Sequence, residues 1–235
     1  MSVPLTVIRL PESLNHRALA ELNQALTAAP DDGVIVLRAV EGSKVFCLGM
    51  DFSESNQTDE RLLAGLRAFA GILHWLRESP LVSIAAVAGA AIGGGLGLAA
   101  ACDVVVATDQ ACFGLPEALY GFSPAIVSVV LRDRLTLQAA RLLALRCETI
   151  DAATAERVGL VDVLTDGAGF ERVLRYEARR LGRAQLAGRQ AVKHRFSFEP
   201  DLGQELEEAT RLTYSRLTDP EVRERLQLMA AGELF

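Results

Sequence analysis

An apolar run broken by three consecutive glycines constrains this chain more than any other stretch. The run covers residues 84–103, carries no charge before Asp103, and contains the glycines at 93–95. Residues 82–90 have the composition of a buried strand, and residues 96–102 that of a short buried helix. Glycines at such a junction leave amide N–H groups unblocked, and the helix N-terminus favours a negative charge there. The pattern predicts an anion or oxyanion site built from the backbone.

Two other interpretations of the run are weaker. It is long enough to cross a membrane, but it consists mostly of Ala and Gly, and three glycines would break a helix in lipid. A structural turn that packs a helix against a sheet would be the default interpretation for one glycine. For three consecutive glycines, a purely structural turn is less favoured than a functional backbone site.

Composition excludes several classes of function. Half of the 235 residues are hydrophobic, and the net charge is −6, which argues against nucleic-acid or anionic-membrane binding. The four cysteines and three histidines follow no ligand or disulfide pattern, so we expect no metal and a reducing cytoplasmic location. The first ten residues lack a basic region followed by a long apolar stretch, so no signal peptide is expected.

Strand and helix patterns alternate through the first half of the chain, which predicts an α/β layer architecture. Beyond about residue 124 the pattern is mostly helical, apart from a strand-like segment at 160–164. After residue 167 only helices are expected. The chain therefore divides into a predicted core, residues 1–166, and a helical packing or assembly region, residues 167–235.

Four segments, in order and at the right spacing, resemble the crotonase superfamily of enoyl-CoA hydratases and isomerases. They are residues 45–51 (VFCLGMD), 93–103 (GGGLGLAAACD), 113–117 (FGLPE) and 159–161 (GLV). The resemblance runs nearly end to end. It implies a spiral core of β-β-α repeats with a C-terminal helical region, assembled as a homotrimer or hexamer.

The resemblance also assigns roles to individual residues. It implies that the backbone N–H groups of Met50 and Gly94 form an oxyanion hole for a thioester enolate. Typical hydratases also carry two glutamates in the site. The second of them matches Glu117, whereas the position of the first is occupied by Gly97, which has no side chain. Residues 124–127 (PAIV) replace the usual glycine-rich element. Two-glutamate addition of water is therefore not expected.

These departures are typical of one subgroup, the stand-alone dehydratases of polyketide β-branching. The similarity lies in residues 45–52, 95–97, Glu117 and 121–125. It implies a lyase that dehydrates a 3-hydroxy-3-methylglutaryl group on an acyl carrier protein to a 3-methylglutaconyl thioester, with no cofactor beyond the pantetheine arm. The alternatives are a single-glutamate isomerase or hydratase of acyl-CoA, and a non-catalytic subunit that binds acyl carriers.

A few further residues are candidates for the site or its partner. Asp51 and Tyr120 are possible pocket residues, although capping of a loop and packing in the core explain them as well. The arginine-rich stretch at 179–195 predicts contacts with an acidic carrier protein or a phosphate through Arg183, Arg189 and Lys193. A solvated helix face paired with the acid-rich segment 199–208 is an equal alternative.

Overall fold

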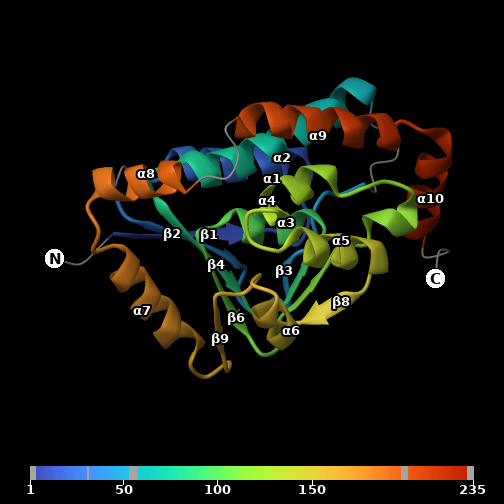
Figure 1. Cartoon of the computed structure of the whole chain (residues 1–235). Helices are drawn as coiled ribbons and strands as arrows, with labels where there is room; N and C mark the ends of the chain where they lie inside the picture. Colours follow the sequence, from blue (N-terminus) through green and yellow to red (C-terminus); the bar gives the residue numbers. More distant parts are fainter. Residues whose placement is uncertain (1–3, 31, 53–57, 197–200, 232–235) are drawn as a thin grey trace.

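The computed structural model describes residues 4–30, 32–52, 58–196 and 201–231, and its strands form two sheets surrounded by helices (Figure 1). The larger sheet is parallel and has the order β1 (Leu5–Leu10), β2 (Val34–Ala39), β4 (Val82–Val87), β6 (Val104–Thr108), β9 (Val163–Thr165). The smaller sheet has the order β3 (Val45–Cys47), β5 (Ala90–Ile92), β7 (Cys112–Gly114), β8 (Thr149–Asp151), and only β8 runs antiparallel.

The chain passes between the two sheets in a repeated pattern. β2 leads into β3 and then α2, β4 leads into β5 and then α3, and β6 leads into β7 and then the short 3₁₀ helix η1. Each repeat adds one strand to each sheet, which gives the predicted spiral of β-β-α units. The helices are α1 (His16–Thr27), α2 (Asp59–Glu78), α3 (Gly94–Ala101), η1 (Glu117–Tyr120), α4 (Ala125–Leu131), α5 (Leu137–Arg146), α6 (Ala152–Arg157), α7 (Phe170–Leu181), α8 (Leu186–Arg195), α9 (Leu202–Leu217) and α10 (Pro220–Ala230).

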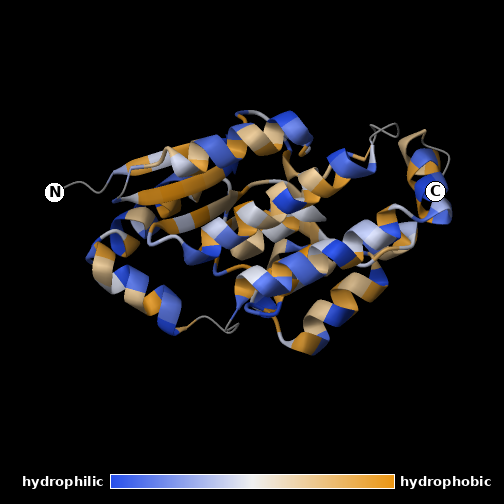
Figure 2. Cartoon of the chain, turned by 90° about the horizontal axis from the view of Figure 1, so that it is seen from above, coloured by the Kyte–Doolittle hydropathy of each residue, from blue (hydrophilic) through white to orange (hydrophobic). Residues whose placement is uncertain are grey.

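Both faces of the central strands β2, β4 and β6 are covered, which explains why these strands read as nearly continuous apolar runs. Ile35 and Leu37 point into the main core with α1, α2 and α3, whereas Val34 and Val36 point to the other face, where α7 packs with Phe170 and its neighbours. Figure 1 shows α7 on the opposite side of the sheet from α1 and α2. The central strands are strongly apolar, and the surface helices alternate polar and apolar residues (Figure 2).

Two predicted elements differ in the structure. The single strand predicted over 82–90 is two strands, β4 and β5, in different sheets. Gly89 makes the bend between them possible, because a Cβ there would lie 1.9 Å from the carbonyl oxygen of Lys44. Strand β8, within a region predicted to be helical, exists because it pairs with β7, and such pairing is a tertiary effect that local pattern does not report.

The C-terminal helices reach back over the first half of the chain. α9 packs against α2 and α4, and α10 packs against α9 and η1. In the described part of the chain, no helix has the length and apolar character needed to cross a membrane. Because of the contacts with α2, α4 and η1, helices α9 and α10 lie next to the elements that carry the predicted site.

Candidate active site

The backbone amides of Met50 and Gly94 lie side by side where the loop after β3 meets the start of α3. Gly49 has φ +86°, and a Cβ there would lie 2.5 Å from the Gly94 nitrogen, so only glycine permits this approach. The Met50 nitrogen lies 3.5 Å from the point that a Gly94 Cβ would occupy. The structure therefore brings together the two amides that the resemblance paired.

Hydrogen bonds fix this loop but leave the two amides unused. The Leu14 N–H donates to the Gly49 carbonyl at 2.8 Å, and the Asp51 N–H donates to the Leu14 carbonyl at 3.2 Å. Among the residues that the structure describes, neither the Met50 nor the Gly94 N–H has a protein acceptor. Two fixed donors at the start of the buried helix α3 can stabilise an oxygen that gains negative charge.

Glu117 places a carboxyl group next to this pair of amides. It opens η1, and only 8% of the residue is exposed. Its Oε1 lies 3.1 Å from the point that a Cβ of Gly93 would occupy, and its Oε2 has no hydrogen-bond partner in the described part of the chain. Burial raises the pKa of Glu117 from 4.5 to about 7. A carboxyl with such a pKa can accept and return a proton near neutral pH.

The position beside α3 that a second carboxylate would need is filled. A Cβ on Gly97 would lie 3.0 Å from Val127 Cγ2 and 3.4 Å from Phe69 Cζ. Val127 belongs to the segment 124–127 that departs from the usual glycine-rich element, and it is one of the buried residues of α4. The two departures from typical hydratases are therefore coupled, because one fills the space that the other leaves.

A pocket of about 430 Å³ opens onto the amides and Glu117, within the size range of small-molecule sites. Its wall is mostly apolar, and the side chains that bring polar atoms to it are hydroxyls and carboxylates, with no Lys, Arg or His among the described lining residues. Phe52 and Phe122 meet edge to face on this wall, with ring centroids 5.9 Å apart. The polar lining residues are Ser13, Asp51, Glu117, Tyr120, Ser123 and Thr213.

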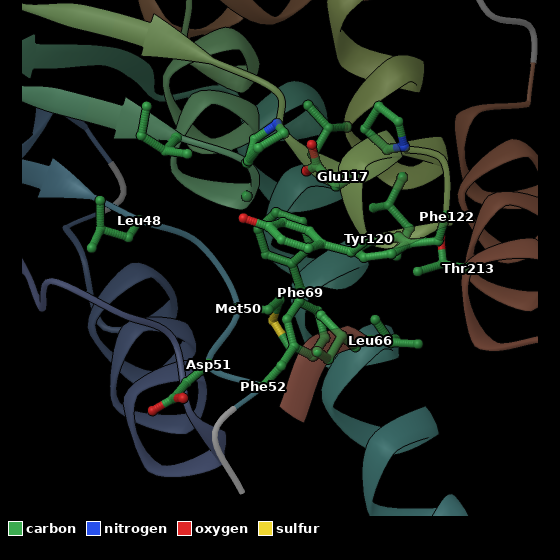
Figure 3. A pocket seen from close by; sticks show the side chains of 18 of the residues that line it. Leu48, Met50, Asp51, Phe52, Leu66, Phe69, Glu117, Tyr120, Phe122 and Thr213 are labelled. Carbon is green, nitrogen blue, oxygen red and sulfur yellow. The ribbon is translucent and has the colours of Figure 1, made fainter. Parts of the chain in front are cut away.

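Tyr120 and Asp51 both line the pocket, but they lie differently in it. Figure 3 shows the Tyr120 ring reaching across the pocket, whereas the Asp51 carboxylate lies on the far side from Glu117 and turns away from it. The pKa of Tyr120 is raised above its usual value of 10, first by burial and then by the charges of Glu117 and Cys147.

The described residues contain no cluster of three or more metal-ligating side chains.

The structure corrects the interpretation of the basic stretch. Arg189 is buried, donates to the Gly33 carbonyl at 2.8 Å and pairs with Asp32. The Lys193 Nζ donates to Asp103 Oδ2 at 3.0 Å and to two backbone carbonyls. Both side chains therefore hold α8 in place and are not available to a carrier protein. Arg183 is exposed between α7 and α8, and its role as a carrier contact stays a prediction.

Part of the pocket wall was not predicted from the sequence. The wall residues that were missed come from α2, α9 and α10, which are far apart along the chain, and most of them are apolar side chains at ordinary helical spacing. Nothing in their pattern distinguishes a pocket wall from core packing. They are Leu66, Phe69, Thr213, Leu226 and Met229.

A spiral of β-β-α repeats with paired amides beside a buried carboxyl defines a crotonase-fold enzyme. The chain belongs to the enoyl-CoA hydratase/isomerase family, whose model matches residues 5–228. It is 30% identical over 217 residues to the "Bacillaene synthase dehydratase PksH" of Bacillus subtilis, covering 89% of this chain and 80% of that protein. The crystal structure of the B. subtilis polyketide biosynthesis enoyl-CoA hydratase pksH superposes with a TM-score of 0.84 and 26% identity, over 95% of this chain and 90% of that one.

Hydratases are similar as well. The chain is 38% identical over 153 residues to the "Probable enoyl-CoA hydratase echA8" of Mycobacterium bovis. That match spans 63% of this chain but only 58% of the mycobacterial protein. The comparisons therefore show the family and support the resemblance to a polyketide dehydratase. Assembly as a homotrimer or hexamer and a cytoplasmic location stay predictions.

Proposed function

We propose that this chain removes water from a 3-hydroxyacyl thioester, with a 3-hydroxy-3-methylglutaryl group on an acyl carrier protein as substrate and a 3-methylglutaconyl thioester as product. The observation that carries the proposal is the one carboxyl beside the two free amides. Glu117 is buried, its Oε2 has no partner in the described part of the chain, and Val127 fills the space next to Gly97. The 30% identity to a named polyketide dehydratase over 89% of this chain supports the same reaction.

The geometry suggests how the reaction proceeds. The thioester carbonyl oxygen accepts hydrogen bonds from the Met50 and Gly94 amides, which stabilise the enolate as its charge develops. Glu117 removes the proton from C2, and the electron pair of that C–H bond enters the enolate. The pair then forms the C2=C3 double bond as the C3–O bond breaks, and the hydroxyl leaves as water once it is protonated. Apart from the pantetheine that carries the acyl group, these steps need no cofactor.

One observation favours a second candidate, a hydratase or double-bond isomerase of an uncharged acyl-CoA. The described lining residues include two carboxylates, Asp51 and Glu117, and no cation, so a distal carboxylate on the acyl group would lack a charged partner. An isomerase needs one carboxyl to move a proton between two carbons, and Glu117 would supply it.

Product analysis separates the candidates. The protein is incubated with hydroxymethylglutaryl-carrier, with an uncharged 3-hydroxyacyl-carrier and with a 3-enoyl-CoA, and the acyl products are identified by mass spectrometry and ultraviolet absorbance. We expect water loss from the first at the highest kcat/KM. Turnover of the 3-enoyl-CoA alone would establish the isomerase. No turnover of any thioester that nevertheless binds would leave the non-catalytic subunit.

A further inference from the structure

Tyr120 shares a face of η1 with Glu117. A 3₁₀ helix has three residues per turn, so side chains three positions apart lie one above the other. Glu117 and Tyr120 are the first and last residues of η1, and both line the same pocket. Figure 3 shows the Tyr120 ring extending from the Glu117 side of the pocket toward Leu48, with its hydroxyl directed into the open space.

The Tyr120 hydroxyl is available to a substrate. It makes no hydrogen bond within the described part of the chain. Burial and the charge of Glu117 raise its pKa, so the hydroxyl keeps its proton at neutral pH and can donate it. The Thr213 hydroxyl in the same wall is already used, because it donates to the Ala209 carbonyl at 2.9 Å.

Dehydration needs a proton donor as well as a base. Hydroxide is a poor leaving group, and Gly97 together with Val127 leaves no space beside α3 for a second carboxyl group. A phenol is a much stronger acid than water, with a pKa of about 10 against about 15.7. Tyr120 is the polar residue that the fold places next to Glu117 on the same face of one short helix.

We infer that Tyr120 is the general acid of the dehydration, donating its hydroxyl proton to the leaving C3 hydroxyl group while Glu117 receives the C2 proton. The C2–H and C3–O bonds break, the C2=C3 bond forms, and the leaving group departs as water. The protonated Glu117 then returns its proton to the Tyr120 phenolate, directly or through water, which restores both groups. This inference rests on the proposed dehydration.

The test uses three reactions that differ in whether the leaving group needs a proton. They are dehydration of the 3-hydroxyacyl-carrier, loss of chloride from the matching 3-chloroacyl-carrier above its spontaneous rate, and exchange of the C2 hydrogen of a saturated acyl-carrier in deuterium oxide. The variant is Tyr120→Phe, which removes one oxygen atom. The matched control is Tyr214→Phe on α9, a tyrosine outside the pocket lining.

We expect Tyr120→Phe to lower kcat for dehydration by about 10²-fold, within the range of general acid catalysis, and to leave chloride loss and C2 exchange unchanged. Tyr214→Phe should change none of the three. An equal loss in all three reactions would make Tyr120 a wall of the pocket only, and an unchanged dehydration rate would give the acid role to Glu117; either result overturns the inference. If the wild-type protein exchanges C2 hydrogen but never releases water, the proposed dehydration itself fails.

Discussion

The pocket around Glu117 and the polar contacts beneath α8 both take charged side chains out of water, but they treat them in opposite ways. Beneath α8, the Lys193 ammonium donates to Asp103 and to the carbonyls of Leu76 and Leu81, each at 3.0 Å. In the pocket, Glu117 has an oxygen with no partner in the described chain and no cation among the described lining residues.

This difference separates a structural role from a chemical one. A buried charge whose hydrogen bonds are all made by the protein stabilises the fold and has nothing left for a ligand. Burial with an unpartnered oxygen disfavours the ionised form of a carboxyl group, and a bound substrate can supply the missing hydrogen-bond partner. The same contrast explains why Lys193, which looked like a carrier contact in the sequence, is an internal brace. Arg189 is held by Gly33 and Asp32, although its buried Nε has no partner in the described part of the chain.

The largest effect should come from removing the unpartnered carboxyl. We predict that Glu117→Gln lowers kcat by about 10²–10⁴-fold, because the amide cannot accept the C2 proton. Single-turnover measurement of product formation checks this, with circular dichroism to show that the fold is kept. Activity close to wild type would move the base to another residue, with Asp51 and Tyr120 next to be tested.

The pH dependence of the rate should report the same carboxyl. Glu117 acts as a base only when it is ionised, so kcat/KM should rise with pH through the pKa of about 7 and level off above it. Well below that value the rate should fall about tenfold per pH unit. A flat profile between pH 5 and 8, measured with a substrate that does not titrate there, would contradict the assignment.

Stability should show the cost of keeping this carboxyl unpaired. Because the folded pKa of about 7 exceeds the ordinary carboxyl value of 4.5, the folded state holds the proton more tightly, and wild-type stability should fall as pH rises between these values. Glu117→Gln lacks this loss, so above pH 7 it should be more stable than wild type by up to about 3 kcal/mol. Urea unfolding at pH 5 and pH 8 measures the difference, which should be small at pH 5. An equal difference at both pH values would contradict the buried, unpartnered carboxyl.

The part of the site that could be predicted is the part carried by short sequence motifs. The motif resemblance named Met50, Gly94 and Glu117, and each lies in a short segment with a recognisable pattern: the first two flank the close approach at Gly49, and Glu117 opens η1. Wall residues such as Phe69 and Leu226 could not be predicted, because only the packing of distant helices brings them to the pocket. The split of one predicted strand into β4 and β5 was missed for the same reason, since it depends on the Lys44 carbonyl across the bend.

Basic residues were the least predictable, because a charge does not reveal its partner. We predict that Lys193→Met lowers the free energy of unfolding by roughly 2–3 kcal/mol, since it leaves Asp103 and two carbonyls without their donor. The activity of the folded variant should be unchanged. Arg183→Met is the matched control, because Arg183 is exposed and its loss should leave stability unchanged. Denaturant unfolding with a parallel activity assay gives both readouts, and a stable Lys193→Met with impaired carrier binding would restore the original interpretation.

The smallest effect concerns the charge that stays exposed. If an acidic carrier protein approaches the turn between α7 and α8, Arg183→Glu should raise KM for the carrier-bound substrate but not for a pantetheine analogue. A single exposed charge contributes about 1 kcal/mol at most, so the increase should not exceed about fivefold. It should also vanish at about 1 M salt, where exposed charges are screened within about 3 Å. α7 covers the face of the larger sheet opposite α1 and α2, which lie on the pocket side, so a carrier that serves this pocket has reason to dock elsewhere. An unchanged KM at low salt would therefore remove Arg183 from carrier recognition.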